Sequence, residues 1–166
     1  MVIFVHFMYS VCVIQIRRIP ITKTGYQELL IKRDELLSQR PDAVKTLKAA
    51  RELGDLSENG LYKGARARLS GIDARLRKLN MQIKLSDIIE PKLNNTVQIG
   101  SIVTVLENGR EKTYKIVGEL EANPKEKNVS VISPIGSTLL GKRVSEETKI
   151  KTPGGVLSII IKKITL

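Results

Sequence analysis

The chain has 166 residues, of which 42% are apolar and 27% are charged, so it is long enough to bury a core and too apolar for a disordered protein. One cysteine and one histidine exclude an internal disulfide and a zinc site built from Cys and His, and this cysteine usage favours a reducing, cytoplasmic compartment. The net charge of +11 favours polyanionic partners, although only 4% of residues are aromatic, which argues against a surface built on base stacking.

Residues 1–18 form an apolar leader, in which sixteen uncharged residues precede Arg17 and Arg18. The run is shorter than the roughly 20 residues that span a bilayer. A secretory signal would carry its positive charge before the apolar run and not after it. We therefore expect an extension upstream of the natural start, or a short extra strand or helix, and no membrane partner; a membrane role is the remaining alternative.

Two amphipathic helices are expected next. From Thr22, which can cap a helix, to about Leu53 the apolar residues fall on one stripe, and Pro41 predicts a kink or a restart. From Tyr62 to Ile83 the apolar spacing alternates between three and four residues, as in a coiled coil. The expected stripe of the first helix consists of Tyr26, Leu29, Leu30, Leu36, Leu37, Ala43, Val44, Leu47 and Ala50.

Folding the two helices back on one another around Gly54 and Asp55 would hide both stripes, so the sequence predicts an antiparallel hairpin. Such a hairpin would extend on the order of 40 Å. A long, thin shape buries little surface for its length, so we expect the length of the hairpin to serve its function.

After a boundary near residues 91–95 the pattern changes to short alternating runs, which predicts a small α+β domain over residues 96–166. Asn108-Gly109 lies between two such runs and predicts a β-hairpin. The other expected elements are strands at 128–133 and 156–166, a short helix at 133–142 and a turn at 151–155.

Asp55 and Glu58 lie at the expected tip of the hairpin, and two interpretations of them are open. In the structural one, Asp55 or Ser57 caps the second helix while Glu58 interacts with its dipole. In the chemical one, the two carboxylates grip one Mg²⁺ through one or two oxygens, in a site that a partner completes.

The second helix is strongly basic, with seven Lys and Arg residues against one Asp between residues 60 and 85. These side chains could simply be solvated on the outside of a coiled coil. Alternatively they track a phosphate backbone, with Arg51 and Arg66 just below the tip as the best candidates. No nucleophile triad, P-loop or dinucleotide glycine pattern is present, so a self-sufficient enzyme is not expected.

The segments "IPITKTGYQELL", "AARELGDLSENGLYKGARA", "SPIGSTLLGK" and "IKTPGG" resemble the bacterial Gre transcript cleavage factors, and the similarity runs from residue 19 to 166. The resemblance implies an α+β chain: a coiled-coil hairpin over residues 19–90, with its tip near 54–59, followed by an FKBP-like domain over 96–166 that binds RNA polymerase. It implies a monomer whose hairpin enters the secondary channel of the polymerase and stimulates cleavage of the RNA 3′ end in backtracked complexes.

By the same resemblance, Asp55 and Glu58 match the tip acids that help to hold a second Mg²⁺, shared with the polymerase active site and not bound stably by the chain alone. Arg51 and Arg66 match the positions that contact the nascent RNA, and a contact with DNA stays open. The chain then is no enzyme itself and activates the polymerase. The alternatives are a channel-binding regulator that inhibits, and a free-standing basic coiled coil that binds nucleic acid.

The chain departs from the family pattern beside the tip. Where the family usually reads "SENAEYHAAR", this chain reads "SENGLYKGAR", so Leu61 replaces an acid, Lys63 replaces a histidine, and Gly60 and Gly64 replace small residues that favour helix. Because glycine costs roughly 0.5–1 kcal/mol relative to alanine in a helix, we expect a looser and more basic tip.

Overall fold

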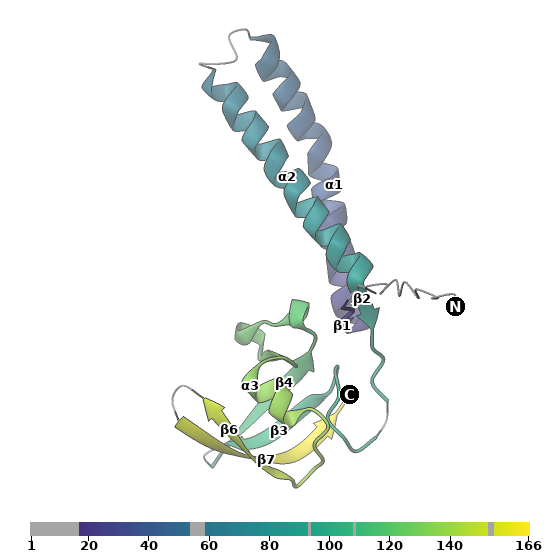
Figure 1. Ribbon diagram of the computed structural model, residues 1–166, viewed down its shortest axis with the longest axis vertical. Helices are drawn as coiled ribbons and strands as arrows, with labels where there is room; N and C mark the ends of the chain where they lie inside the picture. Colours follow the sequence, from purple (N-terminus) through teal and green to yellow (C-terminus); the bar gives the residue numbers. More distant parts are fainter. Residues whose placement is uncertain (1–16, 54–58, 93, 108, 153–154) are drawn as a thin grey trace, which may run out of the picture.

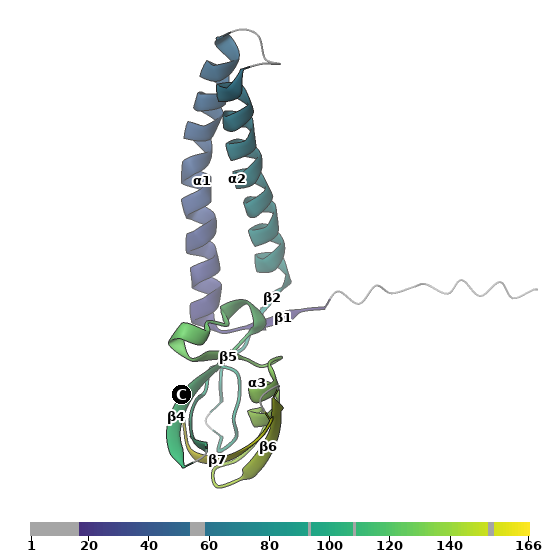
Figure 2. The same cartoon turned by 90° about the vertical axis from the view of Figure 1, so that its left-hand side faces the viewer.

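The computed structural model describes residues 17–53, 59–92, 94–107, 109–152 and 155–166, with the backbone alone between 151 and 156. A pair of long helices stands on a small β-rich unit (Figures 1 and 2). The expected helical hairpin followed by an α+β unit is confirmed. None of the helices in these residues is long and apolar enough to cross a membrane.

The hairpin consists of α1 (Lys23–Glu52) and α2 (Gly60–Leu85). Thr22 caps α1 as expected, because its side chain accepts a hydrogen bond from the Gly25 N–H. The expected restart at Pro41 is wrong, since α1 is one helix through this residue. A proline in a helix removes one backbone hydrogen bond, and the packing of Leu36 and Ala43, which flank the proline, against α2 helps to offset this loss.

The interface between the helices is narrow. Ala43, Ile72 and Leu76 form its buried centre, and Leu36 and Leu69 pack beside them. Two residues of the expected stripe lie outside this interface: Leu37 is 48% exposed and Val44 is 40% exposed. A single partner helix covers only the central line of a stripe, so residues that flank this line stay in contact with solvent.

Two three-residue strands join the base of the hairpin. β1 (Ile19–Ile21) precedes α1, β2 (Ser86–Ile88) follows α2, and the two pair in parallel, Ile19 with Ser86 and Ile21 with Ile88. Ile21 is fully buried. Neither strand was expected, because three residues carry too little pattern to be recognised without their partner.

The β-rich unit is a five-stranded sheet with the strand order β5-β4-β3-β7-β6. The expected hairpin around Asn108-Gly109 is confirmed, although Asn108 lies outside the described residues. The last strand is also confirmed, whereas β6 was not expected and β5 ends three residues earlier than predicted. The strands are β3 (Ile102–Glu107), β4 (Arg110–Val117), β5 (Asn128–Ser130), β6 (Glu147–Thr152) and β7 (Gly155–Thr165).

Short helices connect and cover the sheet. The 3-10 helices η1 (Glu119–Glu121) and η2 (Pro124–Glu126) lie between β4 and β5, and the expected short helix is α3 (Pro134–Leu139). The core of this unit consists of aliphatic side chains from the sheet, from α3 and from the segment before β3: Val97, Val103, Val105, Ile116, Leu139, Ile150, Ile159 and Ile161.

One buried carboxylate lies in this sheet. Glu107 is 8% exposed and accepts hydrogen bonds from Lys112 Nζ at 2.9 Å and from the Tyr114 hydroxyl at 3.0 Å. The hydrogen bond from Lys112 is the main reason that the pKa of Glu107 is lowered. Burial, together with the hydrogen bond to Glu107, raises the pKa of Tyr114 to about 12.

Candidate functional site

The end of the hairpin that carries the tip lies far from the sheet. α1 ends at Glu52 and α2 begins at Gly60, and both of these helix ends point away from the β-rich unit (Figures 1 and 2). With 30 residues, α1 alone is about 45 Å long. Asp55 and Glu58, the candidate metal ligands, lie outside the described residues, so their roles stay predictions.

Asn59 holds the two helix ends together. Its side-chain oxygen accepts a hydrogen bond of 3.1 Å from the Tyr62 N–H, which makes it the N-cap of α2. Its side-chain amide donates to the Ala50 carbonyl oxygen in the last turn of α1, also at 3.1 Å.

The expected cap, Asp55 or Ser57, is therefore wrong, because Asn59 is the residue directly before the helix. Asn59 was not predicted as the cap, although an asparagine immediately before an apolar helical pattern is itself a capping signal. Since Asn59 caps α2, the capping interpretation no longer explains why an acid stands at position 55.

Arg51 and Arg66 lie on different helices next to this end. Arg51 belongs to the last turn of α1, where a cation interacts favourably with the helix dipole, and Arg66 follows two turns into α2. Both side chains are exposed, and neither takes part in an ion pair between described residues. Both side chains therefore lie on the surface of the hairpin.

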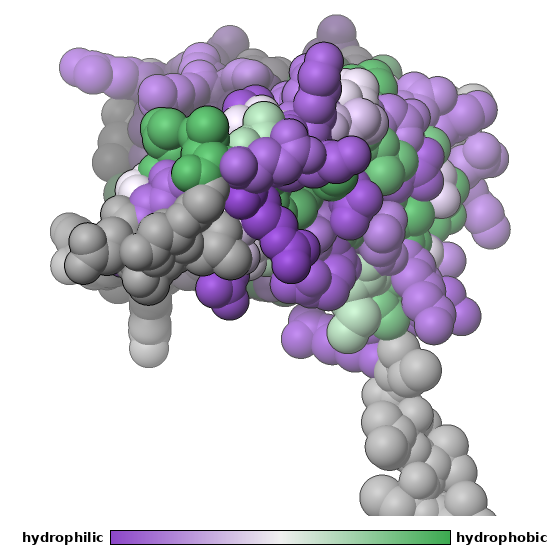
Figure 3. Space-filling model, turned by 90° about the horizontal axis from the view of Figure 1, so that it is seen from above, coloured by the Kyte–Doolittle hydropathy of each residue, from purple (hydrophilic) through white to green (hydrophobic). Residues whose placement is uncertain are grey.

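The basic residues of α2 are on its surface. Asp73, the one acid of this helix, pairs across the hairpin with Arg40 of α1 at 2.8 Å. This hydrogen bond lowers the pKa of Asp73 and raises the pKa of Arg40. Hydrophilic side chains dominate the molecule seen from the hairpin end (Figure 3). The exposed cations of α2 are Lys63, Arg66, Arg68, Arg75, Arg77, Lys78 and Lys84.

A groove lies between the ends of the two helices, and Gly60, Leu61 and Gly64, three of the residues that depart from the family pattern, line part of it. Leu53 and Leu61 are both 69% exposed, and no neighbouring atom lies within 4 Å of the place where a Cβ of Gly60 or Gly64 would stand. The groove has a volume of about 520 Å³. It is lined by residues of both helices: Thr46, Ala49, Ala50, Leu53, Gly60, Leu61, Gly64, Ala65 and Arg68.

The side chains that the structure describes offer no site for a metal ion. Within these residues, no three His, Cys, Asp or Glu side chains gather closely enough to hold an ion. In proteins, Mg²⁺ usually keeps several waters and is held by one or two carboxylates together with phosphates of a substrate, and seldom by a dedicated all-protein cage. The role of Asp55 and Glu58 as ligands of a metal ion shared with a partner stays a prediction, because both lie outside the described residues.

Two family models match the chain. The transcription elongation factor N-terminal model of GreA and GreB matches residues 19–88, and the corresponding C-terminal model matches residues 91–166. The chain is 39% identical over 142 residues to "Transcription elongation factor GreA" of Ruegeria pomeroyi, covering 83% of this chain and 91% of the relative. It is 36% identical over 152 residues to the protein of the same name from Syntrophobacter fumaroxidans, covering 89% and 97%.

Among solved structures, the GreA factor homolog 1 protein of Thermus thermophilus is 25% identical, with 90% of this chain and all of that chain covered and a TM-score of 0.43. The two family models together match residues 19–88 and 91–166, so both halves of the sequence match the same family. The chain belongs to the GreA/GreB family of transcription elongation factors.

Proposed function

We propose that this chain binds RNA polymerase through the secondary channel and stimulates endonucleolytic cleavage of the RNA 3′ end in backtracked, arrested complexes, so that elongation resumes. The observation that carries the proposal is the hairpin itself. It extends about 45 Å and ends next to the sequence "GDLSEN", far from the β-rich unit.

In this proposal, the tip acids supply ligands that the polymerase lacks. Asp55 and Glu58 hold a second Mg²⁺ together with the active site of the polymerase, and they orient the attacking water. The ion, when bound, activates the water and stabilises the leaving oxygen of the RNA. The chain does not bind the ion stably alone and performs no catalysis without the polymerase.

The cations beside the tip hold the RNA. Arg51 and Arg66 are exposed on the two helices that flank residues 54–58, so both can reach phosphates of a strand that passes the tip. Guanidinium groups bind phosphate oxygens in a bidentate manner. The basic face of α2 continues this surface toward the base of the hairpin, and the β-rich unit remains outside the channel, where it binds the polymerase as a monomer.

Replacement of the tip acids tests the proposal. A backtracked polymerase complex is incubated with Mg²⁺ and the purified chain, and the transcript is sized. We expect Asp55→Ala with Glu58→Ala to lower the cleavage rate on the order of 10²-fold or more, as when a charged group of a preorganised site is removed, while polymerase binding stays unchanged. The matched control is Glu35→Ala with Asp42→Ala, which removes two exposed acids from the side of α1.

Two other outcomes would overturn the proposal. Slower elongation without RNA shortening would indicate an inhibitor that occupies the channel. Salt-dependent binding of naked RNA, with no effect on polymerase, would indicate a free-standing nucleic-acid binder.

A further inference from the structure

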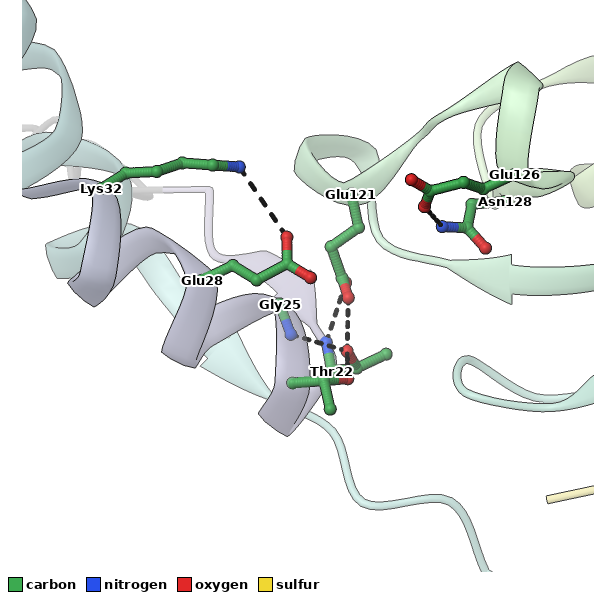
Figure 4. A network of polar contacts seen from close by, with 8 residues as sticks. Thr22, Gly25, Glu28, Lys32, Glu121, Glu126 and Asn128 are labelled. Atoms are coloured by element: carbon green, nitrogen blue, oxygen red, sulfur yellow. Dashed lines mark hydrogen bonds and ion pairs between the residues drawn. The ribbon is translucent and has the colours of Figure 1, made fainter.

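One carboxylate joins the base of the hairpin to the β-rich unit. Glu121 of η1 accepts a hydrogen bond from the backbone N–H of Thr22 at 2.9 Å and another from the Thr22 hydroxyl (Figure 4). The same carboxylate accepts from the Gly118 N–H at 3.1 Å within its own loop. Thr22 is 6% exposed and caps α1, so the first residue before the hairpin is bound to a residue 99 positions away.

The charge of Glu121 matches this position. The first turn of α1 contains no acidic residue of its own and begins with Lys23. A helix N-terminus carries a partial positive charge that a nearby carboxylate stabilises. The β-rich unit therefore supplies the negative charge that the first turn of α1 lacks.

Two glycines allow the close approach. A Cβ on Gly25 would overlap the carboxyl carbon of Glu121, and a Cβ on Gly118 would overlap the carbonyl oxygen of Pro20. Neither glycine has a positive φ angle, so glycine is needed at these positions because a side chain would not fit, and not because of the backbone conformation. Gly25 thus leaves room for the Glu121 carboxylate, and Gly118 leaves room for the backbone of β1.

The contact between Thr22 and Glu121, which we call the joint, lies at the base of a long hairpin, so a small rotation there moves the opposite end of the hairpin by a large distance. For a hairpin about 45 Å long, a change of ten degrees at Thr22 displaces the tip by about 8 Å. Catalytic groups lose on the order of 10²-fold in rate when they are displaced by about 1 Å. A loose joint would therefore disperse the tip acids over a volume much larger than an active site.

We propose that Glu121 is a positioning residue for transcript cleavage: it fixes the direction of the hairpin relative to the β-rich unit and so aims the tip. This inference rests on the proposed function and adds to it a residue that touches neither RNA nor metal. Glu121 acts through Thr22 and the axis of α1.

The first test measures the direction of the hairpin without polymerase. Spin labels are placed at Lys48→Cys in α1 and Lys149→Cys in β6, two exposed sites, with Cys12→Ser in every variant. We expect Glu121→Ala to broaden the distribution of distances between the labels. The control is Glu126→Ala, because this nearby exposed carboxylate hydrogen-bonds Asn128 at 3.1 Å and not the hairpin (Figure 4). An unchanged distribution in Glu121→Ala would overturn the inference.

A second variant approaches the joint from the other side. Gly25→Ala improves the helix propensity of α1, yet its methyl group would displace the Glu121 carboxylate. We expect it to broaden the distance distribution while helix content is retained. Because Glu121→Ala removes the overlapping group, the double variant should be no worse than Glu121→Ala alone. Strictly additive effects of the two substitutions would contradict the proposed contact.

The cleavage assay then separates positioning from binding. In Glu121→Ala we expect the maximal cleavage rate to fall tenfold or more, with the half-saturating concentration of the factor within twofold of the parent. Full cleavage despite a broadened distance distribution would refute the positioning role. Should the parent chain fail to stimulate cleavage, the proposed function is wrong, whereas the distance measurements decide on the joint by themselves.

Discussion

Asn59 offers the sharpest test of how the hairpin end is held. Asn59→Ala removes the acceptor for the Tyr62 N–H and the donor to the Ala50 carbonyl, both at 3.1 Å. Loss of an asparagine cap costs about 1 kcal/mol, and loss of a partly buried hydrogen bond costs about 1 kcal/mol more. We therefore expect the free energy of unfolding to fall by about 2 kcal/mol, which corresponds to a melting temperature lower by about 4–8 °C for a chain of this size.

Thermal unfolding followed by circular dichroism at 222 nm measures this loss, and hydrogen exchange locates it. Amides in the first turn of α2 should exchange faster in Asn59→Ala. Asn59→Asp keeps the capping oxygen and loses only the donor to Ala50, so it should cost about 1 kcal/mol or less. The matched control is Asn80→Ala, on the exposed face of α2. If Asn59→Ala unfolds at the temperature of Asn80→Ala, the proposed bridge between the helices does not exist.

The remaining predictions concern the interface between the two helices and the packing of the β-rich unit. Ile72→Ala should lower the free energy of unfolding in urea by about 2–4 kcal/mol, because this side chain is 5% exposed between the helices, whereas Leu37→Ala, 48% exposed, should cost far less. Because the folded state lowers the pKa of Glu107, its contribution should be present above its unfolded pKa and be lost as pH falls through the folded pKa, which acid titration of the melting temperature measures. Because the pKa of Tyr114 is raised to about 12, its contribution should be complete below pH 10 and be lost as pH rises toward 12; Tyr114→Phe should remove this alkaline loss. Gly136→Ala should destabilise the fold by about 1–3 kcal/mol, since its Cβ would overlap a backbone carbonyl of β5; an unchanged urea midpoint would contradict this close approach.

The helices and the turns could be predicted because their signals are local. The alternating three- and four-residue spacing from Tyr62 to Ile83 lies within one helix, and the Asn108-Gly109 turn lies between the strands that it joins. The exposure of Leu37 and Val44 could not be predicted in the same way. Which part of a stripe is covered depends on how wide its partner is, and the partner lies elsewhere in the chain.

The same distinction between local and long-range signals applies to the candidate site. From the sequence alone we could predict that Asp55 and Glu58 lie at the tip between Arg51 and Arg66, because the turn of a hairpin lies at one end whatever else the hairpin contacts. The contacts that hold the two ends of the hairpin became visible only in the folded chain: Asn59 reaches back to α1, and Glu121 binds Thr22 across 99 residues. Helix periodicity is a property of neighbouring residues, whereas a hydrogen bond between distant segments exists only once packing has brought its donor and acceptor together.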